Sequence, residues 1–133
     1  MNTSHGNAVR RYALVSPDAD LDIQEAVLEA LPQEVNPYGG HATDFVIHRA
    51  FGSSAGMRGL VADTAELAKD RYPPNRLATR LIDALGGPDR YCFGHVAICG
   101  YRLGQEDELL LCGLSDSQCH LITQVYSAVY EQA

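Results

Sequence analysis

The chain has no run of about 20 apolar residues, the length that a membrane-spanning helix needs. Its first eleven residues are polar and lack the apolar segment of a secretion signal. Basic residues are also few: the chain has 10 Lys and Arg and 17 Asp and Glu, which gives a formal net charge of −7. Since phosphate contacts need clustered bases, we expect no direct binding of nucleic acid or of an anionic membrane. We therefore predict a cytoplasmic protein.

Cysteine is too scarce for a disulfide framework, and in a cytoplasmic protein we expect the four cysteines to be free thiols. The 133 residues fit one domain that can bury a core without disulfides or metals. Hydrophobic residues make up 46% and charged residues 20%, which is ordinary for globular proteins. No repeat or linker divides the chain. We predict a flexible tail over 1–10 and a single domain over 11–133.

Hydrophobic periodicity and turn residues predict three helices and five strands. The strands are expected at 12–15, 45–51, 60–62, 91–101 and 109–114, and the helices at 20–31, at 76–85 and from 116 onward. Because hairpins outnumber crossover connections, this order favours the α+β class. We expect a mainly antiparallel or mixed sheet of about five strands with three helices packed on it.

The acids are concentrated in part of the chain, and residues 18–34 contain six of them and no base. Apolar residues at every fourth position predict an amphipathic helix over 20–31. On such a helix Asp22, Glu25 and Glu29 form one exposed stripe. This stripe either complements the positive end of the helix dipole or acts as a docking face for a basic protein, imitating a phosphate backbone.

A second group of candidate residues surrounds the expected helix at 76–85. Asn75 suits the N-cap position, and the glycines at 86–87 suit the C-terminal stop. Arg76 and Arg80 share one face of this helix, where they are either solvated or able to bind an anion. The glycine-rich segment 52–59 is either a hairpin turn or a loop whose amides hold a phosphate.

Cysteine and histidine occur in two pairs that could bind a metal. Cys92 and His95 have C-x-x-H spacing, and Cys119 precedes His120, but a zinc site needs four ligands that converge. On a strand, residues three apart face opposite sides. A catalytic thiolate would need a neighbouring base, and buried thiols more often act as small hydrophobic residues. We therefore predict no metal, no cofactor and no catalytic residue.

Several short motifs resemble one known family. Asn75 with Ala78, "GHVAICG" at 94–100 and "LLCGLSDSQ" at 110–118 are similar to domain-of-unknown-function family 3846, and "RYALVSP" at 11–17 suits the same layout. Members of this family occur in phages, plasmids and conjugative elements. The resemblance implies an accessory protein of a mobile element, and it supplies no activity or site residue.

The sequence thus predicts a small, acidic, non-enzymatic interaction protein of a phage or mobile element. It would bind a protein partner stoichiometrically and inhibit a host nucleic-acid-binding or defence protein. The predicted partner-binding residues are Asp22, Glu25, Glu29, Asn75, Arg76 and Arg80. The alternative is a small-molecule or nucleotide-binding module, with or without enzymatic activity. Tyr126 and Tyr130, one helical turn apart, either cover the core or form a contact between two copies of the chain.

Overall fold

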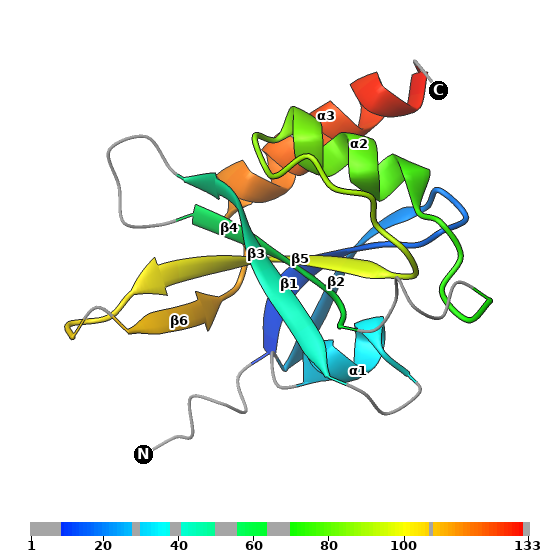
Figure 1. Ribbon diagram of the computed structural model, residues 1–133. Coiled ribbons are helices and arrows are strands. Elements are labelled where there is room, and N and C mark those ends of the chain that lie inside the picture. The colour runs from blue at the N-terminus through cyan, green and yellow to red at the C-terminus, as the bar shows by residue number, and fades with distance from the viewer. Residues whose placement is uncertain are drawn as a thin grey trace.

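The computed structural model describes residues 9–27, 30–37, 41–49, 56–63, 70–106 and 108–131. Its strands are β1 (Val9–Val15), β2 (Leu21–Val27), β3 (Ala42–Arg49), β4 (Gly56–Ala62), β5 (Val96–Leu103) and β6 (Leu109–Cys112), and its helices are α1 (Leu31–Val35), α2 (Arg76–Ala84) and α3 (Asp116–Glu131). Five strands follow the order β2-β1-β5-β4-β3, and β6 also pairs with β5. Every described strand pair is antiparallel, which confirms the predicted α+β class (Figure 1).

The strand β5 lies at the centre of the sheet because both of its edges are paired. One edge binds β4, while the other binds β1 over residues 96–98 and β6 over residues 100–103. The chain has a glycine where the partner changes. A Cβ at Gly100 would lie 2.8 Å from the carbonyl oxygen of Gly113, so the close approach of these segments requires glycine here.

The sheet separates two layers of apolar side chains. Along β5, Val96 and Ile98 face the larger cluster, which α2 and α3 cover, while Ala97 and Cys99 face a smaller cluster that includes Leu31 of α1. Figure 1 shows α2 and α3 side by side on one face of the sheet and α1 on the other. Burial of apolar surface in both layers drives the packing. None of the described helices is long and apolar enough to cross a membrane.

The predicted helix over 20–31 is wrong, because most of this segment is strand β2, which forms a hairpin with β1. At the hairpin turn the N–H of Ser16 donates to the carbonyl of Asp20 (2.9 Å), and Ala19 has a φ of 73°. A three-residue hairpin loop commonly ends in such a left-handed residue, and glycine is the usual occupant. Since alanine takes this position, the sequence carries no clear hairpin signal there.

Because this segment is a strand, the residues of the predicted acidic stripe do not share one face. Asp22 pairs with Leu14 on the face of the sheet that carries α1, whereas Glu25 pairs with Arg11 on the opposite face. The reason is that successive side chains of a strand alternate between the two faces. Glu29 lies outside the described residues. The three acids therefore do not form the stripe that a helix would have produced.

Strand β1 includes the last two residues of the segment that was predicted as a flexible tail. Val9 and Arg10, which were expected in the tail, pair with Val27 and Ala26 in the first hairpin. Residues before Val9 lie outside the described part of the chain. The predicted tail is thus too long at its C-terminal end, because backbone pairing with β2 holds these two residues in the sheet.

The predicted glycine-rich turn at 52–59 also extends too far, since 56–59 belong to β4 and 52–55 lie outside the described residues. Arg58 forms an ion pair with Asp44 (2.6 Å), and its guanidinium carbon lies 5.0 Å from the ring centre of Tyr101. These contacts hold Arg58 on the surface of the sheet. Arg58 therefore does not supply the positive charge that the hypothesis of a phosphate-binding loop at 52–59 requires.

Two predicted helix ends are confirmed in atomic detail. At the start of α3, the N–H of Ser115 donates to Gln118 Oε1 (2.9 Å) and the N–H of Gln118 donates to Ser115 Oγ (3.1 Å), which is a capping box. After α2, Gly86 has a φ of 92° and the N–H of Gly87 donates to the carbonyl of Ile82 (2.8 Å). This is the left-handed stop that the glycine pair predicts.

Tyr12 is fully buried on the α1 face, and its hydroxyl lies 2.8 Å from Gln24 Oε1 and 2.8 Å from Glu34 Oε1. Burial raises the pKa of Tyr12, and the contact with Glu34 raises it further. The folded protein therefore holds the neutral phenol, whereas the unfolded chain ionises near its ordinary pKa of about 10.

Above about pH 10 we expect this difference to lower the free energy of unfolding by about 1.4 kcal/mol per pH unit. The sign follows from the raised pKa, since the stabilisation is complete below the unfolded pKa and is lost as the pH rises through the folded one. The measurement is urea unfolding of the wild type and of Tyr12→Phe at pH 8 and pH 11. Groups shared by both proteins cancel, so an unchanged difference between the two proteins would refute the expectation.

Candidate functional site

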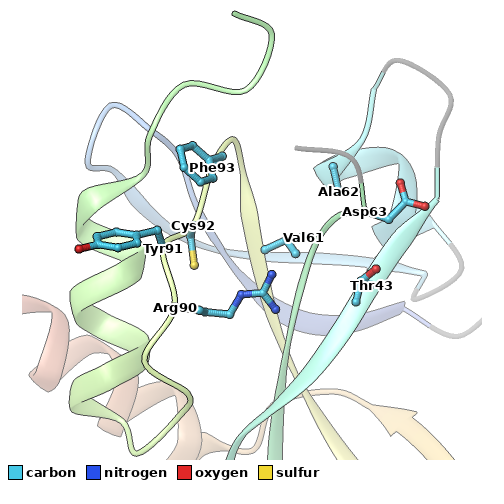
Figure 2. A pocket seen from close by; sticks show the side chains of 8 residues that line it. All are labelled: Thr43, Val61, Ala62, Asp63, Arg90, Tyr91, Cys92 and Phe93. Carbon is cyan, nitrogen blue, oxygen red and sulfur yellow. The ribbon is translucent and has the colours of Figure 1, made fainter. Parts of the chain in front are cut away.

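Residues 91–93 form a common wall between two cavities. A groove of about 550 Å³ lies between this segment and the start of α2, where Pro74, Asn75, Arg76, Thr79 and Arg80 line it. A smaller cavity of about 170 Å³ lies on the other side, between the same segment and strands β3 and β4 (Figure 2). The smaller cavity brings together segments that are far apart in the sequence, since Thr43 and residues 90–93 both line it.

Backbone and side-chain hydrogen bonds tie this wall to α2. The N–H of Cys92 donates to Thr79 Oγ1 (3.0 Å), and that hydroxyl donates to the carbonyl of Asn75 (2.9 Å). The N–H of Asn75 donates to the carbonyl of Cys92 (2.8 Å), and the N–H of Gly94 donates to the carbonyl of Pro73 (2.7 Å). The wall is therefore fixed to the helix start by main-chain groups rather than by side-chain packing alone.

The predicted strand at 91–101 is correct only from residue 96. Before that point the chain turns at Gly94, which has a φ of 74°, and a Cβ there would lie 2.8 Å from Cδ1 of Tyr72. A side chain at this position would meet both backbone strain and a steric clash. The turn directs residues 91–93 out of the sheet and toward α2.

Asn75 is the residue that joins the helix, the wall and the sheet. Its side chain is 1% exposed; Oδ1 accepts from the N–H of Ala78 (3.0 Å), and Nδ2 donates to the carbonyls of Val15 (2.9 Å) and Gly94 (2.8 Å). The predicted N-cap is confirmed. Because both donors are used inside the protein, the partner-binding role predicted for Asn75 does not fit, and we assign it a structural role.

Arg76 and Arg80 lie on the same face of α2 as Thr79, and both are exposed. In the described part of the chain, neither arginine forms an ion pair. Tyr91 stands beside them on the wall and is 79% exposed, which is unusual for so large a ring. The positive end of the α2 dipole adds to the charge of the arginines. The rim of the groove thus combines two cations with an aromatic surface.

The six predicted partner-binding residues therefore fall into separate places. Asn75, Arg76 and Arg80 meet at the groove, with Asn75 buried beneath it. Asp22 and Glu25 lie on β2 and do not line either cavity. Glu29 lies outside the described residues.

Among the described residues, the cysteines and histidines do not form a common metal site. Cys92 and Cys99 are buried, and burial raises the pKa of both thiols, that of Cys99 to about 12. Cys119 and His120 lie on α3, and His95 directly precedes β5. Within the described ranges, no three His, Cys, Asp or Glu side chains gather as a metal site. A raised pKa also disfavours the thiolate that nucleophilic catalysis requires.

Two residues of the site have no distinct signal in the sequence. Tyr91 follows the Gly-Gly-Pro break but belongs to a segment predicted as strand, where its ring would count as an ordinary sheet residue. Thr43 lies on β3 and meets the 91–93 wall only in the folded chain. Both become site residues through contacts between distant segments, which periodicity cannot reveal.

Comparisons with protein-family models, with curated proteins and with solved structures gave no match for this chain. The resemblance to family 3846 and the origin in a mobile element that it implies therefore stay predictions. The groove and its residues are therefore the basis for a functional proposal.

Proposed function

We propose that the protein is a cytoplasmic binding module that takes a nucleotide-class ligand, an anion joined to a flat ring, in the groove between α2 and residues 91–93. The observation that carries the proposal is the groove itself, about 550 Å³, with Arg76, Arg80 and Tyr91 around it. This volume lies within the ordinary range for small-molecule sites.

The two arginines supply the anion-binding part of the site. They are four residues apart on one face of α2, so their guanidinium groups can reach one phosphate or two adjacent phosphates. Guanidinium groups bind phosphate oxygens through paired, charge-assisted hydrogen bonds. Because the arginines lie near the N-terminal end of α2, the helix dipole favours a negative charge at the same place.

Tyr91 supplies a surface for the ring of the ligand. Its side chain is 79% exposed and sits on a wall whose backbone is tied to Thr79 and Asn75. Stacking of a base on such a ring is worth about 1–3 kcal/mol by alanine substitution. Because hydrogen bonds already hold the backbone of this wall, the wall itself loses little conformational entropy when a ligand stacks on Tyr91.

The geometry supports this function better than docking of a basic protein on an acidic stripe. Asp22 and Glu25 lie on opposite faces of the sheet, so they cannot act as one continuous surface. The arginines and Tyr91, in contrast, border one cavity. Inhibition of a host protein remains a prediction.

We expect nucleotides such as ATP, GTP or NAD to bind the purified protein and to raise its melting temperature, and adenosine to bind far more weakly because it lacks phosphate. Arg80→Gln should weaken binding by about tenfold, the value of one charge-assisted contact. Tyr91→Ala should weaken it by about tenfold as well. Tyr91→Phe should retain most of the affinity because it keeps the ring. Isothermal titration calorimetry measures each effect.

Arg102→Gln is the matched control, because Arg102 is exposed on β5 and lines neither cavity. It should bind nucleotides as the wild type does. Raising the salt concentration should weaken nucleotide binding to the wild type, because exposed charges are screened. Failure of all the nucleotides to bind, or equal affinity in Arg80→Gln and the wild type, would exclude the proposal.

A further inference from the structure

The neutral polar side chains that line the groove between α2 and residues 91–93 already have hydrogen-bond partners inside the protein. Nδ2 of Asn75 donates to two main-chain carbonyls, and Oδ1 accepts from the N–H of Ala78. Oγ1 of Thr79 donates to the carbonyl of Asn75 and accepts from the N–H of Cys92. Both amide protons of Asn75 and the hydroxyl proton of Thr79 are therefore used, so neither side chain has a donor left for a ligand.

The other side chains of the described lining supply charge and apolar surface. Arg76 and Arg80 carry the positive charges. Figure 2 shows the Tyr91 ring pointing away from β3 and β4, on the side of α2. Pro74 is exposed and Phe93 is half-buried, and apolar atoms make up most of the exposed lining. A ligand in this groove thus meets two guanidinium groups and the faces of apolar side chains.

Discrimination between bases depends on hydrogen bonds to the edge of the ring. A site that is built to bond a particular N–H or O–H group rejects a ligand without that group by about 10⁴-fold or more. Stacking tolerates exchange of the base, because every base has a π face. Adenine and guanine differ in the groups at their edges, whereas the areas of their faces are nearly equal. A groove that stacks a ring without bonding its edge should therefore bind both equally.

We propose that the groove recognises its ligand by the phosphate and by the face of the ring, without reading the edge of the ring. This inference rests on the nucleotide-binding function proposed above and defines its ligand class, which is the phosphorylated compounds of any flat ring system. The guanidinium groups of Arg76 and Arg80 bind the phosphate, and the ring lies on Tyr91. Affinity follows the area of the ring, so FMN with three fused rings binds more tightly than a purine nucleotide, and a pyrimidine nucleotide binds more weakly.

The test is a calorimetric titration of the full chain with AMP, GMP, UMP, FMN and ribose 5-phosphate. We expect the affinities for AMP and GMP to agree within about fivefold, because stacking depends on the ring face. UMP should bind more weakly than AMP, and FMN more tightly. Ribose 5-phosphate, which has no flat ring, should bind at least about tenfold more weakly than AMP. A larger than fivefold difference between AMP and GMP, or binding of FMN weaker than that of UMP, would overturn the inference.

Two variants of Tyr91 examine the same point in the protein. Because this side chain is 79% exposed, its substitution should leave the fold intact, which circular dichroism checks. Tyr91→Leu removes the stacking surface, so it should weaken binding of AMP, GMP and FMN, remove the advantage of FMN over UMP, and leave ribose 5-phosphate unaffected. Tyr91→Phe removes the hydroxyl and should keep the ratio of the AMP and GMP affinities unchanged. A changed ratio would show that the phenol oxygen reads the edge of the base, against the inference.

The titrations also separate failure of this inference from failure of nucleotide binding itself. If AMP binds, Arg80→Gln weakens its binding and GMP does not bind, the groove is a nucleotide site that reads the base, and only the inference fails. If none of the nucleotides binds, both the inference and the proposed function fail. Arg102→Gln, the control that lines neither cavity, should keep all the affinities of the wild type.

Discussion

Replacing Asn75 by alanine is expected to lower the free energy of unfolding by about 4 kcal/mol. The substitution removes the N-cap of α2, which is worth about 1 kcal/mol. It also leaves the carbonyls of Val15 and Gly94 without their side-chain donor in a buried place. Each unsatisfied buried group costs about 1–3 kcal/mol. Urea unfolding followed by circular dichroism measures the change.

Two variants separate the roles of this side chain. Asn75→Asp keeps the oxygen that accepts from the N–H of Ala78 but loses both donors, so we expect it to be destabilised at least as strongly as the alanine variant. Ser115→Ala removes the exposed N-cap of α3 alone and should cost only about 1 kcal/mol. If Asn75→Ala cost no more than Ser115→Ala, Asn75 would be a cap and nothing further.

Substituting valine for Gly59 is expected to destabilise the protein by about 3 kcal/mol. A Cβ at this position would lie 2.6 Å from Cζ of Phe45 and 3.0 Å from Cδ1 of Ile47. Both side chains belong to or pack against the main core cluster, so they have little room to move. The displaced ring also contacts the guanidinium of Arg90.

Gly104→Val is the matched control, because a Cβ there meets only the flexible carboxylate of Glu108, which can turn into solvent. We expect it to cost less than about 1 kcal/mol. Combining Gly59→Val with Phe45→Leu should recover part of the lost stability, because the smaller side chain leaves the added methyl groups room. If the two substitutions lowered the free energy of unfolding additively, Phe45 would not be the residue that clashes with the added side chain.

Local sequence patterns predicted the parts of the fold that depend on local chemistry. The Ser115–Gln118 capping box and the glycine stop after α2 need only residues within one turn of each other. The first hairpin was not predicted, because Ala19 takes the left-handed position where glycine would have marked the turn. The four-residue spacing of Ile23, Val27 and Leu31 then imitated a helix.

The residues of the candidate site also include some that local sequence patterns predicted and some that they did not. Arg76 and Arg80 were predicted as a pair because the i and i+4 positions of a helix share a face. Tyr91 and Thr43 were not predicted, because their place in the site depends on the folded chain. Hydrogen bonds of Cys92 with Asn75 and Thr79 join the wall to α2, and the sheet brings β3 to the wall. Such contacts depend on the whole fold. Asn75, for example, donates a hydrogen bond to the carbonyl of Val15, which is 60 residues away in the sequence.

β2 is an edge strand of the sheet, and an edge strand can pair with a strand of another molecule. Every second residue of an edge strand directs its N–H and C=O groups away from its neighbour, and no described strand pairs with this side of β2. Such an edge is open to another strand, and Ile23 is 37% exposed along it. Asp22 and Glu25 place one carboxylate on each face of this edge strand. Charged side chains on an edge strand are among the features that disfavour edge-to-edge pairing of molecules, and these two acids give β2 such charges without any need for a partner.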